Sequence, residues 1–102
     1  MRTVPATLVT IVAEAILRER LVQMALDSGA SGYTLVECSG RGSRGLRSTT
    51  PVGGRNVRIE VVTSTSAAER LLARCSEYFP NYAVVVWTAP VHVVRAEKFG
   101  AQ

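Results

Sequence analysis

The residues best suited to chemistry form one short segment, residues 39–48, which reads SGRGSRGLRS. It combines glycines and arginines without any acid or aromatic side chain, namely Gly40, Arg41, Gly42, Ser43, Arg44, Gly45 and Arg47. Guanidinium groups bind phosphate and carboxylate through paired hydrogen bonds. Glycines let backbone N–H groups come close to an anion. The segment therefore predicts a cradle for a phosphate or another oxyanion.

The charge of the chain is concentrated around this segment. The net charge is +4, and the four arginines between residues 39 and 55 equal it, because that interval contains no acid. The rest of the chain is balanced, which favours a local anion site over a surface coated with positive charge for nucleic acid. All but one of the twelve basic residues are arginine, a bias that GC-rich codon usage also produces.

The glycine spacing matches two nucleotide-binding motifs, but only in part. Residues 40–45 fit the G-x-G-x-x-G pattern of dinucleotide-binding folds and the glycine interval of a Walker A loop. Each motif needs a helix directly after its last glycine, so that the helix N-terminus meets the phosphate. Pro51, Gly53 and Gly54 oppose such a helix, and Leu46 stands where the Walker lysine is required. Neither motif is assigned, and the anion chemistry common to both remains.

The flanking sequence predicts the elements that hold the loop between residues 39 and 55. Apolar or alternating runs indicate strands at residues 7–13, 32–38, 56–62, 82–88 and, after a turn at Ala89-Pro90, 91–95. Apolar residues at helical spacing indicate helices over residues 14–28 and from a capping box at 66–69 to Phe79. This order predicts a single α+β domain, residues 1–102, with the ferredoxin-like βαββαβ arrangement, a long loop and a short extra C-terminal strand.

The strands predict self-association, because they leave little polar surface for the face of the sheet that no helix covers. Trp87 is expected in the core or at a subunit contact. Cys38 and Cys75 lack the spacing of a metal site or a disulfide framework and indicate ordinary thiols in a reducing cytoplasm. The apolar N-terminal run breaks at Glu14, so neither a secretory segment nor a membrane insertion is expected.

The stretch GASGYTLVECSGRGSRGLRS, residues 29–48, resembles the PII-like signalling proteins. It is most similar to the branch associated with bicarbonate transport and carboxysomes, in which a G-Y-T strand leads into a G-[KR]-G-S-R-x-x-R-S loop. The runs NVRIEVVTSTSAAERLL and YAVVVWTAPV extend the resemblance over nearly the whole chain. The resemblance implies a homotrimer with adenine nucleotides in the clefts between neighbours and a long loop, the T-loop, that orders around the phosphates.

The resemblance also implies roles for particular residues. Arg44 and Arg47 would hold phosphate oxygens, assisted by Arg41 and Ser43, with the backbone of Gly40 and Gly42 lining the site. Other residues would lie where the family's cleft holds the base and ribose, or would enter from the neighbouring subunit: Thr34, Glu37, Ser39, Thr88, Ala89, Pro90 and Arg95. Each of these also fits an ordinary strand-edge or turn position, and that alternative stays open.

The function implied by the resemblance is a non-enzymatic sensor that signals to inorganic-carbon uptake. ADP or AMP is the expected ligand, cyclic AMP and ATP stay open, and bicarbonate is a candidate second ligand. The protein partner would be a bicarbonate transporter or a carboxysome component. The loop lacks the tyrosine that nitrogen-regulatory members modify, and the chain ends without the cysteine-containing tail of some transporter regulators.

Two other functions compete with this sensor. A nucleic-acid-binding module would need exposed aromatic side chains to stack bases, and the second strand and the loop offer only Tyr33. A weak nucleotide hydrolase would need a carboxylate to hold a metal ion, and Glu37 and Glu60 are the only acids near the loop. No catalytic residue and no metal ligand is assigned, since one histidine and two separated cysteines make a poor ligand set.

Overall fold

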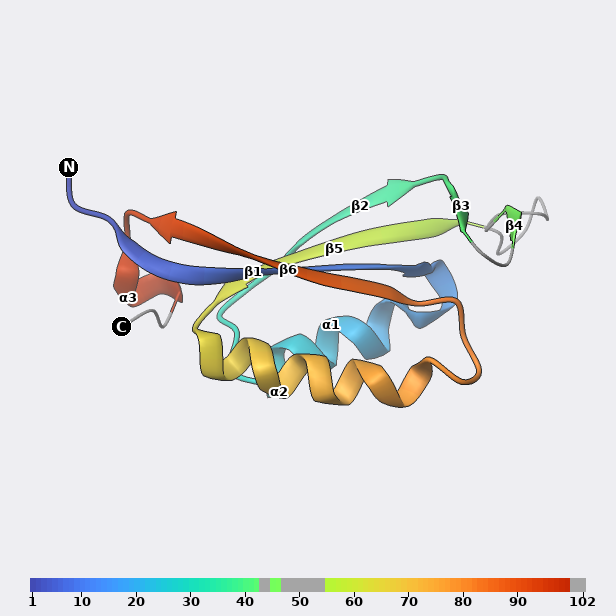
Figure 1. The fold of residues 1–102 in the computed structure, drawn as a ribbon. Coiled ribbons are helices and arrows are strands. Elements are labelled where there is room, and N and C mark those ends of the chain that lie inside the picture. The colour runs from blue at the N-terminus through green and yellow to red at the C-terminus, as the bar shows by residue number, and fades with distance from the viewer. Residues whose placement is uncertain (43–44, 47–54, 100–102) are drawn as a thin grey trace.

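The protein folds into a four-stranded antiparallel sheet with two helices packed against one face (Figure 1). The computed structural model describes residues 1–42, 45–46 and 55–99. The strands of this sheet are β1 (Val4–Glu14), β2 (Thr34–Cys38), β5 (Asn56–Thr63) and β6 (Val85–Val93). The helices are α1 (Arg18–Asp27), α2 (Thr65–Cys75) and the short α3 (Ala96–Phe99), with 3₁₀ turns at Ala15–Leu17 and Ser76–Tyr78. A small ribbon pairs β3 (Arg41–Gly42) with β4 (Gly45–Leu46).

The strand order is β2-β5-β1-β6, which confirms the ferredoxin-like arrangement. The central strand β1 pairs with β5 from Thr7 to Glu14 and with β6 from Val4 to Val12. Alternate side chains of β1 and β5 point to the helices and are buried, namely Val9, Ile11, Ala13, Val57, Ile59 and Val61. They pack with Leu21 and Ala25 of α1 and with Leu71 and Cys75 of α2.

The two helices are fixed to each other and to the sheet by a few specific contacts. Gly29 ends α1 with a φ of 114°, a conformation that favours glycine. The Arg70 guanidinium of α2 donates to the Ser28 carbonyl through Nε at 3.0 Å and Nη2 at 2.8 Å. Ser64 caps α2, because its Oγ accepts a hydrogen bond from the Ala67 N–H at 3.2 Å. The capping box expected at residues 66–69 was wrong, because the capping residue is Ser64, two residues earlier, directly after β5.

The separate fifth strand expected at residues 91–95 was also wrong. β6 runs without interruption from Val85 to Val93, and Ala89 and Pro90 lie inside it opposite Leu8 and Thr7 of β1. β6 is an edge strand with one hydrogen-bonded neighbour, so the N–H that proline lacks is not required on its outer side. The chain then leaves the sheet at Val94 and forms α3, which the sequence did not predict.

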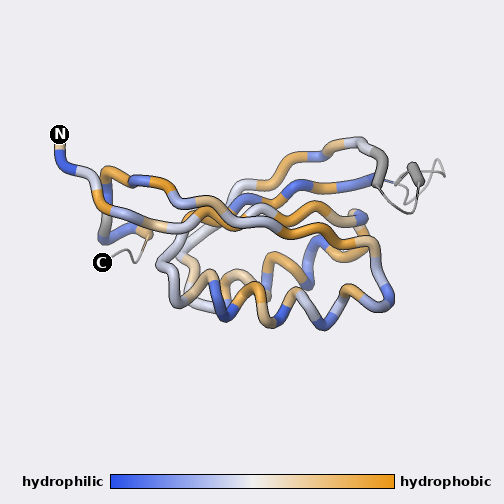
Figure 2. The backbone as a smooth tube through the Cα atoms, viewed as in Figure 1, coloured by the Kyte–Doolittle hydropathy of each residue, from blue (hydrophilic) through white to orange (hydrophobic). Residues whose placement is uncertain are grey.

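Helices α1 and α2 cover one face of the sheet (Figure 1). No helix of the described residues covers the second face in the same way. Hydrophobic stretches run along the strands (Figure 2), and Val36, Val85 and Trp87 on this face are 40–48% exposed. We call this surface the open face. Trp87 is therefore a surface residue of the single chain, which leaves the subunit contact as its expected role. None of the helices that the structure describes is long and apolar enough to cross a membrane.

Candidate functional site

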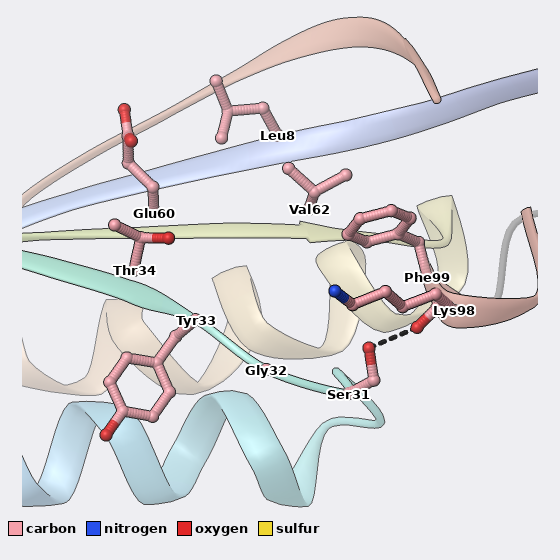
Figure 3. A pocket seen from close by; sticks show the side chains of 9 residues that line it. All are labelled: Leu8, Ser31, Gly32, Tyr33, Thr34, Glu60, Val62, Lys98 and Phe99. Carbon is pink, nitrogen blue, oxygen red and sulfur yellow. Dashed lines mark hydrogen bonds between the residues drawn. The ribbon is translucent and has the colours of Figure 1, made fainter. Parts of the chain in front are cut away.

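A pocket of about 350 Å³ lies at the end of the sheet where β2 begins (Figure 3). It is lined by residues from β1, β2, β5, α3 and the connection between α1 and β2: Leu8, Ser31, Gly32, Tyr33, Thr34, Glu60, Val62, Lys98 and Phe99. Among the sequence-predicted site residues, Thr34 alone lines it. We call this cavity the β2 pocket.

Strand register brings the lining residues of the sheet together. Thr34 lies opposite Glu60, and Leu8 lies opposite Val62, so the four side chains share the open face. From the other side, α3 follows β6 and reaches the α1–β2 connection, where Ser31 Oγ donates a hydrogen bond to the Lys98 carbonyl. The resulting pocket joins segments that are far apart in the sequence.

The chemistry of the β2 pocket is apolar on its walls and polar at a few points. Leu8, Val62 and Phe99 supply apolar surface, while Thr34 supplies a hydroxyl and Glu60 a carboxylate. Such a combination is typical of sites for small organic ligands with a flat apolar part and a few polar groups. The pocket therefore suits a small organic ligand with apolar and polar parts better than it suits a bare ion.

The two charged side chains of the pocket are not paired with each other. Glu60 Oε2 lies 4.0 Å from Arg58 Nε, a partly exposed and therefore weak pair. Lys98 Nζ lies 5.8 Å from the centroid of the Phe99 ring, and its side chain extends from α3 into the pocket in Figure 3. Within residues 1–42, 45–46 and 55–99, no three His, Cys, Asp or Glu side chains gather as a metal site.

The opposite end of β2 forms the root of the basic loop. Glu37 Oε2 lies 3.3 Å from Arg55 Nη1 across the two strands that frame the loop, and both side chains are largely exposed. Beyond Cys38 the backbone enters the β3–β4 ribbon, in which Gly42 lies opposite Gly45. Gly45 lies in a strand, so it does not open the helix that a dinucleotide fingerprint or a Walker A loop requires.

Asn56 lies at the loop root with a fully buried side chain, and neither Oδ1 nor Nδ2 has a hydrogen-bond partner among the described residues. Its strand positions face Cys38 on β2 and Glu14 on β1. A buried amide without partners is costly, and within the described part of the chain this residue keeps a donor and an acceptor without a partner. In the sequence, this residue stands out only as an asparagine at the start of a strand that otherwise alternates between apolar and polar residues.

The structure separates the sequence-predicted site residues into groups. Thr34 starts β2, whereas the loop follows its end at Cys38, about 13 Å away at the usual rise per strand residue. Glu37, Ser39, Gly40, Arg41 and Gly42 belong to the loop end, whereas Ser43, Arg44 and Arg47 lie outside the described residues.

The predicted residues near the C-terminus form a third group. Thr88, Ala89 and Pro90 lie within β6 rather than in a turn, and Ala89 faces the pocket residue Leu8 across the strands. Arg95 is exposed before α3, and its carbonyl accepts a hydrogen bond from the Lys98 N–H at 3.1 Å. The described chain does not bring the three groups together at one place.

Sequence reasoning missed most of the residues that line the pocket, above all Lys98 and Phe99. Gly32 and Tyr33 belong to the G-Y-T motif, but they carried no assigned role. Glu60 stands out in the sequence as an acid near the loop, and not as part of a pocket. Lys98 is the only lysine of the chain, but its place in the sequence does not show where it lies in the fold.

Comparison with known proteins identifies the family. The profile described as nitrogen regulatory protein P-II matches residues 6–98. The chain belongs to this P-II family of regulatory proteins, which confirms the resemblance to the family. The branch associated with bicarbonate transport and carboxysomes stays a prediction. A PII-like signaling protein from Thermus thermophilus is 47% identical, with 97% of this chain and 99% of that chain covered and a TM-score of 0.84.

More distant structures share the fold. CPII from Thiomonas intermedia, a nitrogen regulatory PII-like protein solved with ADP, AMP and bicarbonate, is 23% identical. The match covers 99% of this chain and 98% of that chain, with a TM-score of 0.88. A second CPII structure, bound to ADP and bicarbonate, is 24% identical over 96% and 97% of the two chains, with a TM-score of 0.87. At these identities the likeness concerns the fold alone.

Proposed function

We propose that the protein is a non-enzymatic regulator that binds adenine nucleotides in clefts between the subunits of a homotrimer. The observation that carries the proposal is the separation of the β2 pocket from the root of the basic loop. One chain has a half-apolar pocket at one end of β2 and a strongly basic segment beyond the other end. Association of copies would let the loop of one subunit meet the pocket of its neighbour.

In this proposal the β2 pocket holds the adenosine part of the ligand. The apolar side chains Leu8, Val62 and Phe99 offer surface to the adenine ring, and the Thr34 hydroxyl lies at the same opening. The Glu60 carboxylate is an acceptor suited to the ribose hydroxyls. Ala89, together with Thr88 and Pro90, would lie along the β6 side of the cleft.

The phosphates would lie against the loop of the neighbouring subunit. Arg44 and Arg47 would form paired hydrogen bonds to phosphate oxygens, and Arg41 and Ser43 would support them. The backbone N–H groups of Gly40 and Gly42 would line the cradle, with Glu37, Ser39 and Arg95 at its edges. Because the loop would lose conformational freedom on binding, affinities in the micromolar range are expected.

The open face is the surface proposed to join the three subunits. Val36, Val85 and Trp87 expose hydrophobic area that no other part of the described chain covers. Exposed hydrophobic side chains that lie on one face of a sheet are typical of a protein–protein contact. Burial of Trp87 in the trimer would shift its fluorescence, so dilution monitored by fluorescence and light scattering would measure the assembly.

Bicarbonate is proposed as a second ligand, because CPII was solved with bicarbonate as well as ADP and AMP. A planar oxyanion suits the arginines of the loop, and the buried Asn56 amide is a described group with unused hydrogen-bonding capacity near the loop root. Through the ligand-dependent shape of the loop, the protein would signal to inorganic-carbon uptake. The partner would be a bicarbonate transporter or a carboxysome component in the cytoplasm.

Calorimetric titration with ADP, AMP, ATP and cyclic AMP, each with and without bicarbonate, tests the proposal. ADP or AMP should bind most tightly, without turnover in a parallel assay of released phosphate. Absence of binding by all four at about millimolar concentration would contradict the nucleotide function. Rapid phosphate release would favour the hydrolase instead.

A further inference from the structure

We infer that Cys38 is a site of reversible oxidation by hydroperoxides, and that the buried Asn56 amide stabilises the sulfenic acid that forms there. The site lies where β2 ends, next to the β3–β4 ribbon of the basic loop (Figure 1). Oxidation of the thiol does not depend on the proposed nucleotide function. Its effect on nucleotide affinity rests on that function, because Cys38 directly precedes the loop.

Strand register places the Cys38 thiol beside the Asn56 amide. The two residues are partners in the antiparallel pair of β2 and β5, so their side chains lie on the same face with Cβ atoms about 5 Å apart. Cys38 is partly exposed, whereas Asn56 is fully buried. Partial exposure admits an oxidant as small as hydrogen peroxide, and an oxygen added to the sulfur has the buried amide as its neighbour.

The Asn56 amide is the feature that distinguishes this thiol from an ordinary one. Neither Oδ1 nor Nδ2 has a hydrogen-bond partner within residues 1–42, 45–46 and 55–99, and the Cys38 sulfur is no exception. A buried polar side chain without a partner is rare in folded proteins. A thiol is only a weak donor and acceptor, whereas a sulfenic acid carries a hydroxyl that donates and accepts. Oxidation therefore supplies the partner that the reduced protein lacks.

The oxidation balances with a hydroperoxide as the second reactant. After the thiol has lost its proton to solvent, the thiolate sulfur attacks one peroxide oxygen and the O–O bond breaks. With hydrogen peroxide the leaving hydroxide takes up a proton and becomes water. Sulfur loses two electrons, peroxide gains them, and Cys38 is left as S–OH. A low-molecular-weight thiol then attacks this sulfur, releases water and forms a mixed disulfide, which a second thiol molecule reduces.

Cys75 is a control within the same chain. It lies on α2 in the core, on the other side of the sheet, and is fully buried. Burial raises the pKa of its thiol to about 11, so little of the reactive thiolate is present at neutral pH. The chain has no third cysteine, and the sheet separates these two thiols. The expected product is thus a mixed disulfide with an external thiol, because the fold offers Cys38 no internal partner.

Trapping with dimedone, which reacts with sulfenic acids, followed by mass spectrometry tests the site in the assembled protein. Under hydrogen peroxide at neutral pH, Cys38 should carry the adduct and Cys75 should not. Absence of an adduct on Cys38, or equal adducts on both thiols, would overturn the inference.

A variant tests the role of the amide. Asn56→Leu keeps the size of the side chain and should fold, because it replaces an unpartnered buried amide with an apolar group. It should lower the trapped fraction of Cys38 about fivefold, the usual effect of losing one hydrogen bond, and increase irreversible oxidation. Asn81→Leu, at an exposed position, is the matched control. Trapping in Asn56→Leu equal to that in the native protein would remove the amide from the site.

ADP titration separates the oxidation site from the nucleotide function. Protein capped at Cys38 with glutathione should bind ADP about fivefold more weakly than reduced protein, because the added carboxylates at the loop root repel the phosphates. Cys38→Ser should bind normally and ignore peroxide. Unchanged affinity of the capped protein would overturn the link to the loop. If reduced protein binds no ADP, the nucleotide function fails while the trapping result still decides the oxidation site.

Discussion

The two ends of β2 differ in how they build a binding surface. At the start of the strand, register and packing collect side chains from five segments into a pocket of about 350 Å³. Beyond its end, three arginines and three glycines of the loop fall within the ten residues 39–48. The pocket depends on tertiary structure, whereas the charge of the loop is set by the local sequence. A ligand with a flat base and a charged tail needs both.

Removing the charge of the loop should have the largest effect. Arg44→Ala combined with Arg47→Ala should weaken ADP binding by about a hundredfold, because two charge-assisted contacts to phosphate are lost. The melting temperature and the trimer should be retained, since neither residue belongs to the described core. Calorimetry and light scattering would measure both properties. The control for net charge is Arg18→Ala combined with Arg20→Ala, which removes two exposed arginines of α1. Loss of the trimer in the loop variant would contradict the account.

A change in the pocket should have a smaller and more selective effect. Glu60→Gln should weaken ADP binding about tenfold, because a charged acceptor for the ribose hydroxyls becomes a neutral one. Binding of 2′,3′-dideoxy-ADP should be weak already and should change little on the same substitution. Glu69→Gln, at an exposed position of α2, is the control. Equal losses for both ligands would place Glu60 outside the ribose site.

The two cysteines differ in burial, and the buried one makes the stability of the protein depend on pH. Burial raises the pKa of the Cys75 thiol from 9.0 to about 11, whereas Cys38 at the loop end is partly exposed. The folded state holds the Cys75 proton more tightly than the unfolded state does, so this contribution to stability is complete below pH 9 and is lost as pH rises toward 11. Between about pH 8 and 9.5 the loss should be roughly 0.8 kcal/mol.

Urea unfolding at these two pH values measures that loss, with Cys75→Ala as the reference that lacks the titrating thiol. The difference in the free energy of unfolding between the native protein and Cys75→Ala should no longer change with pH below about pH 8. At that pH an alkylating reagent should modify Cys38 and leave Cys75 intact in the folded protein. Equal alkylation of both thiols would mean that the core around Cys75 opens readily.

The fold was predictable because its signals are local and repeated. The continuous apolar run at residues 7–13 and the alternation of apolar and polar residues at 56–62 identify β1 and β5, and both signals lie within the strand itself. The errors fall where tertiary structure decides. Pro90 is a turn residue by local preference, yet it lies within β6 because an edge strand tolerates it. α3 is too short for its pattern to stand out.

From the sequence we predict an anion site at the loop end, whereas of the pocket residues only Thr34 was predicted to belong to a site. Ten consecutive residues expose the anion chemistry of the loop, whereas the pocket depends on register, for instance Leu8 opposite Val62 and Thr34 opposite Glu60. No local pattern shows that Lys98 reaches the start of β2. The burial of Asn56 likewise follows from packing, since asparagine is usually exposed.

The most direct test of the central claim is complementation between two defective variants. One carries Thr34→Val with Glu60→Gln and has a damaged pocket; the other carries Arg44→Ala with Arg47→Ala and has a damaged loop. In mixed trimers, some clefts would join the intact pocket of one chain to the intact loop of its neighbour. ADP titration should therefore recover sites of native affinity that neither variant has alone. Mixed trimers that form but recover no such sites would contradict a site shared between subunits.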